Sequence, residues 1–112
     1  MNWQELNNIE DYSSLIDSSS LNKSTIALFK HSTRCSISSL AKRRIESDWN
    51  KLNPDVPIFL IDLIQHRDLS NFIATDLKIE HQSPQIILLV EGNPIYHSSH
   101  LSISSKSIAK RI

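Results

Sequence analysis

The sequence predicts an α/β protein in which a four-stranded mixed sheet is flanked by helices. Short apolar segments typical of buried strands alternate along the chain with segments whose apolar residues recur at helical spacing. A helix between two strands makes them parallel, whereas the short turn E-G-N-P between the last two strand-like segments makes that pair antiparallel. The length of 112 residues suits one domain over residues 1–112.

The first half of the chain contains two helical patterns around one strand. Apolar residues from about 3 to 16 have spacings that suit a helix or an irregular helical arm. Residues 24–31, S-T-I-A-L-F-K-H, are rich in side chains that fit a buried strand. Residues 36–50 predict a helix, because its apolar side chains share one face. These side chains are Ile37, Leu40, Ala41, Ile45 and Trp49.

The second half begins after a break in the chain at N-P-D-V-P, residues 53–57. The remaining predicted elements are, in chain order, a strand over 57–63, a helix over 67–77, a strand over 85–90, a strand over 94–97 and a helix over 102–112. With helices on both faces, this order predicts a layered α/β fold, although it leaves the order of the strands within the sheet open.

Composition excludes several classes of function. Lysine plus arginine equals aspartate plus glutamate at 12 each, so no net charge recruits nucleic acid or an acidic membrane. The apolar runs at 58–61 and 86–90 are too short to cross a bilayer. The start M-N-W-Q-E-L lacks the features of a secretion signal, so we expect a cytoplasmic protein with a reduced thiol. A single glycine, Gly92, excludes a glycine-rich phosphate loop.

Cys35 is the only cysteine, so it can form no internal disulfide and belongs to no cysteine cluster that would bind structural zinc. It precedes the predicted helix, where unpaired amides and the helix dipole favour a thiolate. Arg34 is adjacent, and Ser36 and Ser38 can offer donors to a sulfur anion. These features suit thiol–disulfide exchange, while the alternative is a buried cysteine that packs as a small apolar residue.

Other cysteine chemistries fit less well. A phosphatase loop of the form C-x-x-x-x-x-R requires arginine at position 41, which is Ala41. A protease-like pair of Cys35 with one of five histidines stays open, but no local signature supports it. His31 could tune the cysteine or simply end the strand, and we favour the structural role. His97 and His100 lack further ligands, so we expect no metal site.

Pro84 in H-Q-S-P-Q lies just before a predicted strand. Proline suits the first residue of a strand, because it cannot donate a hydrogen bond inside the sheet. From this position alone an ordinary trans bond is the expected state, whereas a cis bond would expose the backbone of Ser83 towards a neighbouring loop.

Taken together, K-H-S-T-R-C-S-I-S, H-Q-S-P-Q and the later Y-H-S-S-H resemble the YtxJ family of monothiol bacilliredoxins, which have the thioredoxin fold. The resemblance covers nearly the whole chain from about Trp3. It implies that Cys35 is the catalytic cysteine and that Pro84 is a cis-proline. It also implies that Ser38 stands where a dithiol relative has its resolving cysteine, and that the backbone of Ser83 contacts the disulfide partner. One departure is Ser36, where the family usually has proline.

The resemblance further implies a function. The protein would be a thiol–disulfide oxidoreductase that removes bacillithiol, a low-molecular-weight thiol, from S-bacillithiolated proteins. Bacillithiol would be a co-substrate, with no bound cofactor, and the substrate would meet Arg34, Ser36, Ile37, Ser38 and the Ser83–Pro84 segment. Two alternatives stay open. One is a thioredoxin-like interaction or redox-sensing module without turnover. The other is an iron–sulfur carrier like monothiol glutaredoxins, although their C-G-F-S signature is missing here.

Overall fold

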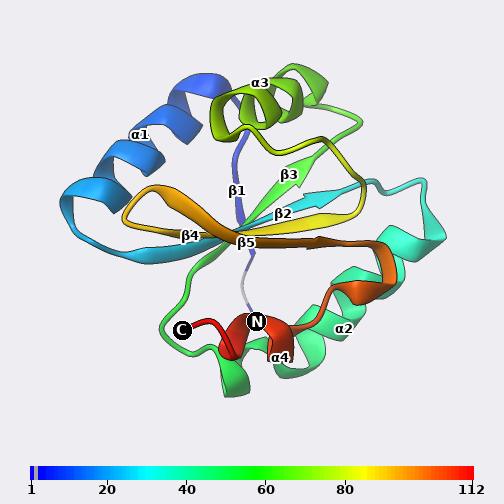
Figure 1. Ribbon diagram of the computed structural model, residues 1–112. Coiled ribbons are helices and arrows are strands. Elements are labelled where there is room, and N and C mark those ends of the chain that lie inside the picture. The colour runs from blue at the N-terminus through cyan, green and yellow to red at the C-terminus, as the bar shows by residue number, and fades with distance from the viewer. Residues whose placement is uncertain (2) are drawn as a thin grey trace.

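The computed structural model describes Met1 and residues 3–112, and it contains one mixed sheet between two layers of helices (Figure 1). The elements are, in chain order, β1 (Gln4–Glu5), α1 (Ile9–Leu21), β2 (Thr25–His31), α2 (Ser36–Leu52), β3 (Ile58–Asp62), α3 (Arg67–Leu77), β4 (Gln85–Val90), β5 (Asn93–Ser99), the 3-10 helix η1 (His100–Ser102) and α4 (Ser105–Ala109).

Strand β2 occupies the centre of the sheet, whose order is β1-β3-β2-β4-β5. It pairs in parallel with β3 and antiparallel with β4, and β5 pairs antiparallel with β4. The mixed sheet expected from the sequence is therefore present. Because β2 and β3 are parallel, the loops that follow them leave from the same end of the strands, and β4 begins at that end.

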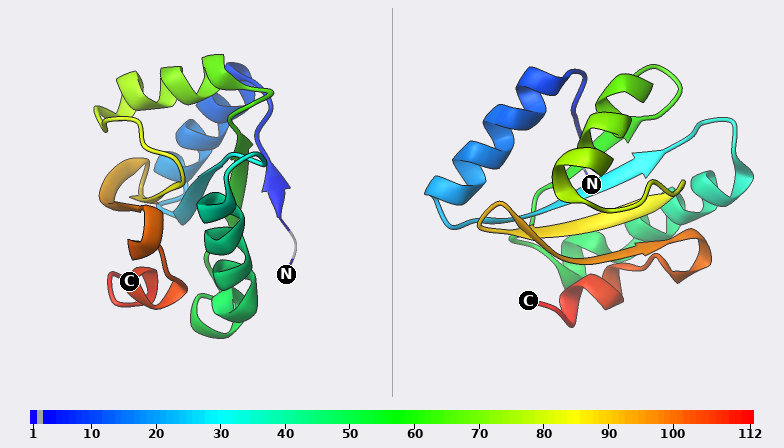
Figure 2. Two further views of the ribbon diagram at one scale, coloured as in Figure 1. Left: turned by 90° about the vertical axis from the view of Figure 1, so that its right-hand side faces the viewer. Right: turned by 45° about the horizontal axis from the view of Figure 1, so that its top comes forward.

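Helices cover both faces of the sheet (Figures 1 and 2), and each face buries its own apolar cluster. Helices α1 and α3 cover one face, where Tyr12 and Leu69 pack with Leu28 of β2. Helices α2 and α4 cover the other face, where Ile45 and Ile108 belong to the second cluster. Successive residues of β2 point to opposite faces, so the strand contributes alternately to both clusters.

The predicted strand count of four is wrong, because the N-terminal arm contributes a fifth strand. Gln4 and Glu5 pair with Phe59 and Leu60 at the edge of the sheet. Both side chains are exposed, and two residues are too short to show the alternation by which a strand is recognised. Helix α1 starts only after Asn8, whose side chain accepts the Asp11 amide at 2.8 Å.

The C-terminal helix is shorter than the predicted range of 102–112. Ser104 caps α4 and accepts the Ser107 amide at 3.1 Å, so the helix cannot begin earlier. The isoleucines of this segment also do not share one environment, because Ile103 and Ile108 are buried whereas Ile112 is 62% exposed. Ile103 precedes the cap and packs from an extended backbone.

Both edge strands are irregular or short. At one edge, β1 has two residues. At the other, β5 carries Pro94, and its register with β4 shifts between Leu88 and Leu89. Among the helices formed by the described residues, none is long and apolar enough to cross a membrane.

Candidate active site at the start of helix α2

Cys35 is the N-cap residue of α2, as its position in the sequence predicts. Its backbone is extended, with φ −110° and ψ 121°, and its carbonyl accepts the Ser39 amide at 3.0 Å. The thiol makes no capping hydrogen bond of its own, and the residue is partly exposed. The sulfur is therefore neither sealed in the core nor engaged with the helix, and it lies where the helix dipole favours an anion.

Pro84 and Cys35 lie at the same end of the central strands. Lys30 of β2 pairs with Gln85 of β4, so the end of β2 that leads to Cys35 meets the start of β4 (Figure 1). The Ser83–Pro84 peptide bond is cis. Pro84 is buried, and its carbonyl accepts the His100 amide at 3.0 Å, which connects this loop to the end of β5.

Four residues around the cysteine divide into an outer and an inner group. Arg34, Ser36 and Ile37 are exposed, so a bound partner can touch them. Ser38 differs from the expectation of a substrate contact, because its side chain is fully buried. The helical turn directs position 38 inward, beneath the loop that carries Cys35, and the hydroxyl makes internal hydrogen bonds.

The Ser38 hydroxyl connects the end of β2 to the loop that leads to Cys35. Its Oγ lies 2.6 Å from Nδ1 of His31, the last residue of β2, and accepts the Ser32 amide at 3.0 Å. The Ser32 carbonyl in turn accepts the Cys35 amide at 3.2 Å. His31 thus ends the strand, as the sequence suggested, and its ring is also hydrogen-bonded to the start of α2.

A second polar cluster lies on the opposite face of the sheet, beneath the loop that ends at Pro84. The ammonium of Lys30 donates to the Ser70 carbonyl at 3.2 Å and lies 3.3 Å from Nδ1 of His81. Ser70 Oγ lies 3.2 Å from the same nitrogen. Lys30 is fully buried. The cluster therefore connects β2, α3 and the loop before Pro84.

The sequence pattern does not predict this cluster, although it carries one signal for it. Ile26, Leu28 and Lys30 share a face of β2, and the first two are core residues. A lysine in the third position of a buried face needs partners from elsewhere in the chain. No local pattern identifies those partners, because Ser70 and His81 are distant in sequence.

Burial changes the ionisation of both clusters. It lowers the pKa of Lys30 to about 8. It also lowers the pKa of His81, and the positive charges of Lys30 and Arg67 lower it further. The pKa of His31 is lowered first by burial and then by Lys42, and Asp62 and Glu46 partly oppose this change.

The late histidines expected to bind no metal lie on β5 and at the start of η1. Both His97 and His100 are exposed, and the latter has a left-handed backbone with φ 56°. Across Met1 and residues 3–112, no three histidine, cysteine, aspartate or glutamate side chains gather as a metal site would require. His100 instead contacts the site through its backbone, by the bond to Pro84.

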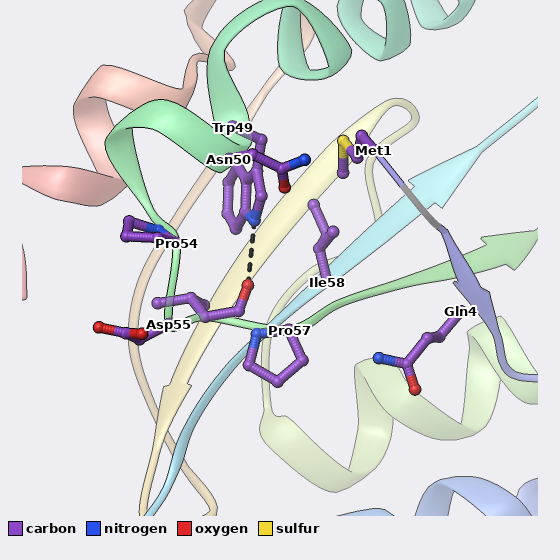
Figure 3. Close-up of a pocket in the computed structure, with 9 residues that line it drawn as sticks. Met1, Gln4, Trp49, Asn50, Pro54, Asp55, Pro57 and Ile58 are labelled. Atoms are coloured by element: carbon purple, nitrogen blue, oxygen red, sulfur yellow. Dashed lines mark hydrogen bonds between the residues drawn. The ribbon is translucent and has the colours of Figure 1, made fainter.

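A pocket lies at the other end of the strands, near the start of β3 (Figure 3). Its volume is about 380 Å³, and its walls include Met1, Trp49, Asn50 and residues 54–57. Trp49 donates its ring N–H to the Val56 carbonyl at 3.0 Å and so closes one wall. The lining contains no cysteine, histidine or basic side chain, so this pocket is separate from the thiol site.

Solved structures share the fold. One described as "A putative oxidoreductase with a thioredoxin fold" matches with a TM-score of 0.83 at 28% identity, covering 96% of this chain and 90% of that chain. Thioredoxin O2 from Arabidopsis thaliana matches with a TM-score of 0.78 at 17% identity, covering 98% of this chain and 93% of that chain. Thioredoxin NaTrxh from Nicotiana alata has a TM-score of 0.74 at 16% identity, with 97% and 88% covered. The fold is therefore the thioredoxin fold, with its one thiol at the start of a helix.

The family is more specific than the fold. Residues 4–108 match the family described as "Monothiol bacilliredoxin BrxC". The chain belongs to this monothiol bacilliredoxin family, and the resemblance seen in the sequence is confirmed.

Proposed function

We propose that the protein removes bacillithiol from protein mixed disulfides through Cys35 alone. The observation that carries the proposal is the placement of the only cysteine, partly exposed at the N-cap of α2 and at the sheet edge where Pro84 lies, in a chain of the monothiol bacilliredoxin family. A thiol in such a position can attack a disulfide when it is ionised.

In the first step, the Cys35 thiolate attacks the bacillithiol sulfur of a protein–bacillithiol disulfide. A new disulfide forms between Cys35 and bacillithiol, while the original disulfide breaks. The target protein leaves as a thiolate, which takes a proton from water. The target is reduced, and the oxidising equivalent passes to Cys35.

In the second step, a free bacillithiol thiolate attacks the bacillithiol sulfur held on Cys35. Bacillithiol disulfide leaves, and the Cys35 thiolate is regenerated. The chain has one cysteine, so it cannot resolve the adduct internally and requires an external thiol. The reductant that later splits bacillithiol disulfide lies outside this cycle.

The target protein meets the exposed rim of the site, formed by Arg34, Ser36 and Ile37. The backbone of Ser83, next to Pro84, would align the extended chain around the target's disulfide. Ser36 keeps an N–H at the first position of α2, where the family's proline has none, so it can donate one more hydrogen bond to a sulfur anion. Such exchange fits the reducing environment of a bacterial cytoplasm that contains bacillithiol.

Intact-protein mass spectrometry tests the proposal directly. The reduced protein is mixed with a bacillithiolated substrate, and the expected product carries one bacillithiol on Cys35, which added bacillithiol then removes. The same substrate carrying glutathione is the matched comparison for the small thiol. No adduct on Cys35 from either substrate would sink the proposal, whereas equal rates with both would remove its specificity for bacillithiol.

Two variants locate the chemistry. Cys35→Ala should leave the substrate bacillithiolated, because no sulfur remains to accept the adduct. Ser38→Ala should still form the adduct, because the attacking sulfur is unchanged. If Ser38→Ala formed no adduct while remaining folded, the simple monothiol first step would be wrong.

A further inference from the structure

The buried chain His31–Ser38–Ser32 ends at the backbone of Cys35 and restricts where protons can lie. A serine hydroxyl has one proton to donate and two lone pairs to accept. The Ser32 amide occupies one lone pair of Ser38 Oγ, since it donates at 3.0 Å. One proton and one lone pair are left, and the His31 ring at 2.6 Å uses one of the two.

The tautomer of His31 decides whether Ser38 Oγ has its proton or its second lone pair left for another partner. If Nδ1 carries no proton, it accepts the Ser38 proton, and the hydroxyl presents only a lone pair elsewhere. If Nδ1 carries the proton, it donates to Ser38, and the hydroxyl keeps its own proton for another acceptor. His31 is 5% exposed and Ser38 is fully buried, so water has little access to this bond.

The acceptor that bears on the proposed chemistry is the sulfur of Cys35. Ser38 is the third residue of α2 and Cys35 is its cap, the two positions that a capping box links by hydrogen bonds across the first turn of a helix. The thiol makes no capping bond in this structure, so no bond of that kind holds the sulfur away from the hydroxyl. A thiolate has only lone pairs to offer, so it can bond to Ser38 only if Ser38 donates.

We infer that His31 is a positioning residue that acts through Ser38. When Cys35 is a thiolate, the ring proton of His31 lies on Nδ1, and Ser38 donates its own proton to the sulfur. When Cys35 carries a disulfide, the sulfur no longer attracts that proton, and Ser38 donates to Nδ1 instead. No proton is lost or gained overall, because the ring releases one proton from one nitrogen and takes up one proton on the other. The inference rests on the proposed function in taking Cys35 as the exchanging thiol.

The surroundings of His31 are compatible with a neutral ring, for which the choice of tautomer matters. Helix α2 faces it with Lys42 and Glu46, and β3 with Asp62. On its own strand, the ring of Phe29 stacks at a centroid distance of 5.8 Å. Burial lowers the pKa of His31, and the neighbouring charges of both signs partly offset one another.

Nitrogen-15 NMR of the His31 ring tests the inference without bacillithiol. We expect the proton on Nδ1 in the reduced protein at a pH where Cys35 is ionised. After Cys35 is alkylated with iodoacetamide, we expect it on Nε2. In Ser38→Ala the tautomer should not respond to alkylation, whereas in the matched control Ser39→Ala it should respond as in the wild type. An unchanged tautomer after alkylation of the wild type overturns the inference.

Alkylation kinetics supply a second readout. His31→Phe keeps the aromatic stack but removes the Nδ1–H that orients the Ser38 proton toward the sulfur. It should slow the reaction of Cys35 with iodoacetamide about threefold near neutral pH, the size expected for one lost hydrogen bond between neutral groups. His31→Asn can still donate to Ser38 and should recover most of the rate. Wild-type rates in a folded His31→Phe protein, or equal losses in both variants, would show that His31 does not act through a donated proton.

The two proposals fail separately. If the wild type shows the tautomer change but forms no adduct with a bacillithiolated substrate, only the proposed function is wrong. If adducts form normally but the tautomer is fixed, only the role of His31 is wrong. Should His31→Phe not fold, the NMR comparison on the wild type and the serine variants still decides the question.

Discussion

The ammonium nitrogen of Lys30 lies 3.3 Å from Nδ1 of His81, and this contact connects the central strand to the loop that ends at Pro84. Lys30 is fully buried, and its other partner is the Ser70 carbonyl rather than a carboxylate. A buried cation without a counter-charge is destabilising, so burial lowers the pKa of Lys30 to about 8. Because of Lys30, we expect the free energy of unfolding to rise with pH in the alkaline range.

Lys30→Met should remove a rise in stability between about pH 8 and pH 10. The pKa of Lys30 is about 8 in the folded protein, against an ordinary value of 10.5. Within that window the unfolded chain binds more protons, so the free energy of unfolding of the wild type increases with pH, by roughly 3 kcal/mol over the whole interval. Urea unfolding at several pH values measures this slope.

The control for this prediction is Lys51→Met, because Lys51 is exposed on α2. It should keep the slope of the wild type. Tyr12, whose pKa is raised by burial, is present in all three proteins and cancels from the comparison. Equal slopes in the wild type and Lys30→Met would contradict the assignment of a depressed pKa to Lys30.

Mild acid should destabilise the protein through His31 and His81. Burial lowers the pKa of each ring below 6.5, so each folded-state ring binds fewer protons than its unfolded counterpart. Their contribution to stability is complete above pH 6.5 and is lost as the pH falls below it. His81→Gln should show a smaller loss between pH 7 and pH 5 in urea unfolding, whereas His97→Gln, at an exposed position, should behave as the wild type.

Leu69→Ala should destabilise the protein by about 2–5 kcal/mol, because it removes buried methyl groups and leaves a cavity beneath α3. Leu69 is fully buried, whereas Leu21, the last residue of α1, is 84% exposed. Leu21→Ala is therefore the matched control, and we expect a change within about 0.5 kcal/mol. Chemical denaturation that gave similar values for both would show that the core cluster is assigned wrongly.

Gly92→Ala should cost about 1–3 kcal/mol at the turn between β4 and β5. Gly92 has φ +80°, a conformation that a side chain disfavours, and an added Cβ would lie 3.2 Å from Cβ of Ser20. Gly92→Asn has the same Cβ but tolerates a left-handed backbone better, so it should cost less than alanine. A thermal melt that ranked asparagine below alanine would indicate that crowding by the larger side chain outweighs the relief of backbone strain.

Regular elements with strong patterns could be predicted from the sequence. Helix α3 and strand β4 have the expected bounds, since helical spacing and a continuous apolar run each mark them clearly. Cys35 at the start of α2 was equally visible, because the apolar face of that helix begins just after it. These elements could therefore be predicted from the local pattern of residues alone.

The rest depends on contacts between distant residues. Strand β1 exists because Gln4 and Glu5 pair with β3, and nothing in their own side chains indicates a strand. The bond from His31 to Ser38 crosses the loop that carries Cys35, and its geometry follows from how β2 enters α2. The partners of Lys30 come from α3 and the following loop, so only the assembled fold identifies them.

The two edge strands of the sheet affect how another extended chain can meet the protein. An exposed, regular edge strand is a template on which another extended chain can add and aggregate. Here one edge consists of two residues, and the other has Pro94, which lacks an N–H, next to a shift of register. Strand addition is therefore disfavoured on both sides, and under the proposed function a target protein would instead meet the exposed rim around the sulfur and leave once its disulfide has been reduced.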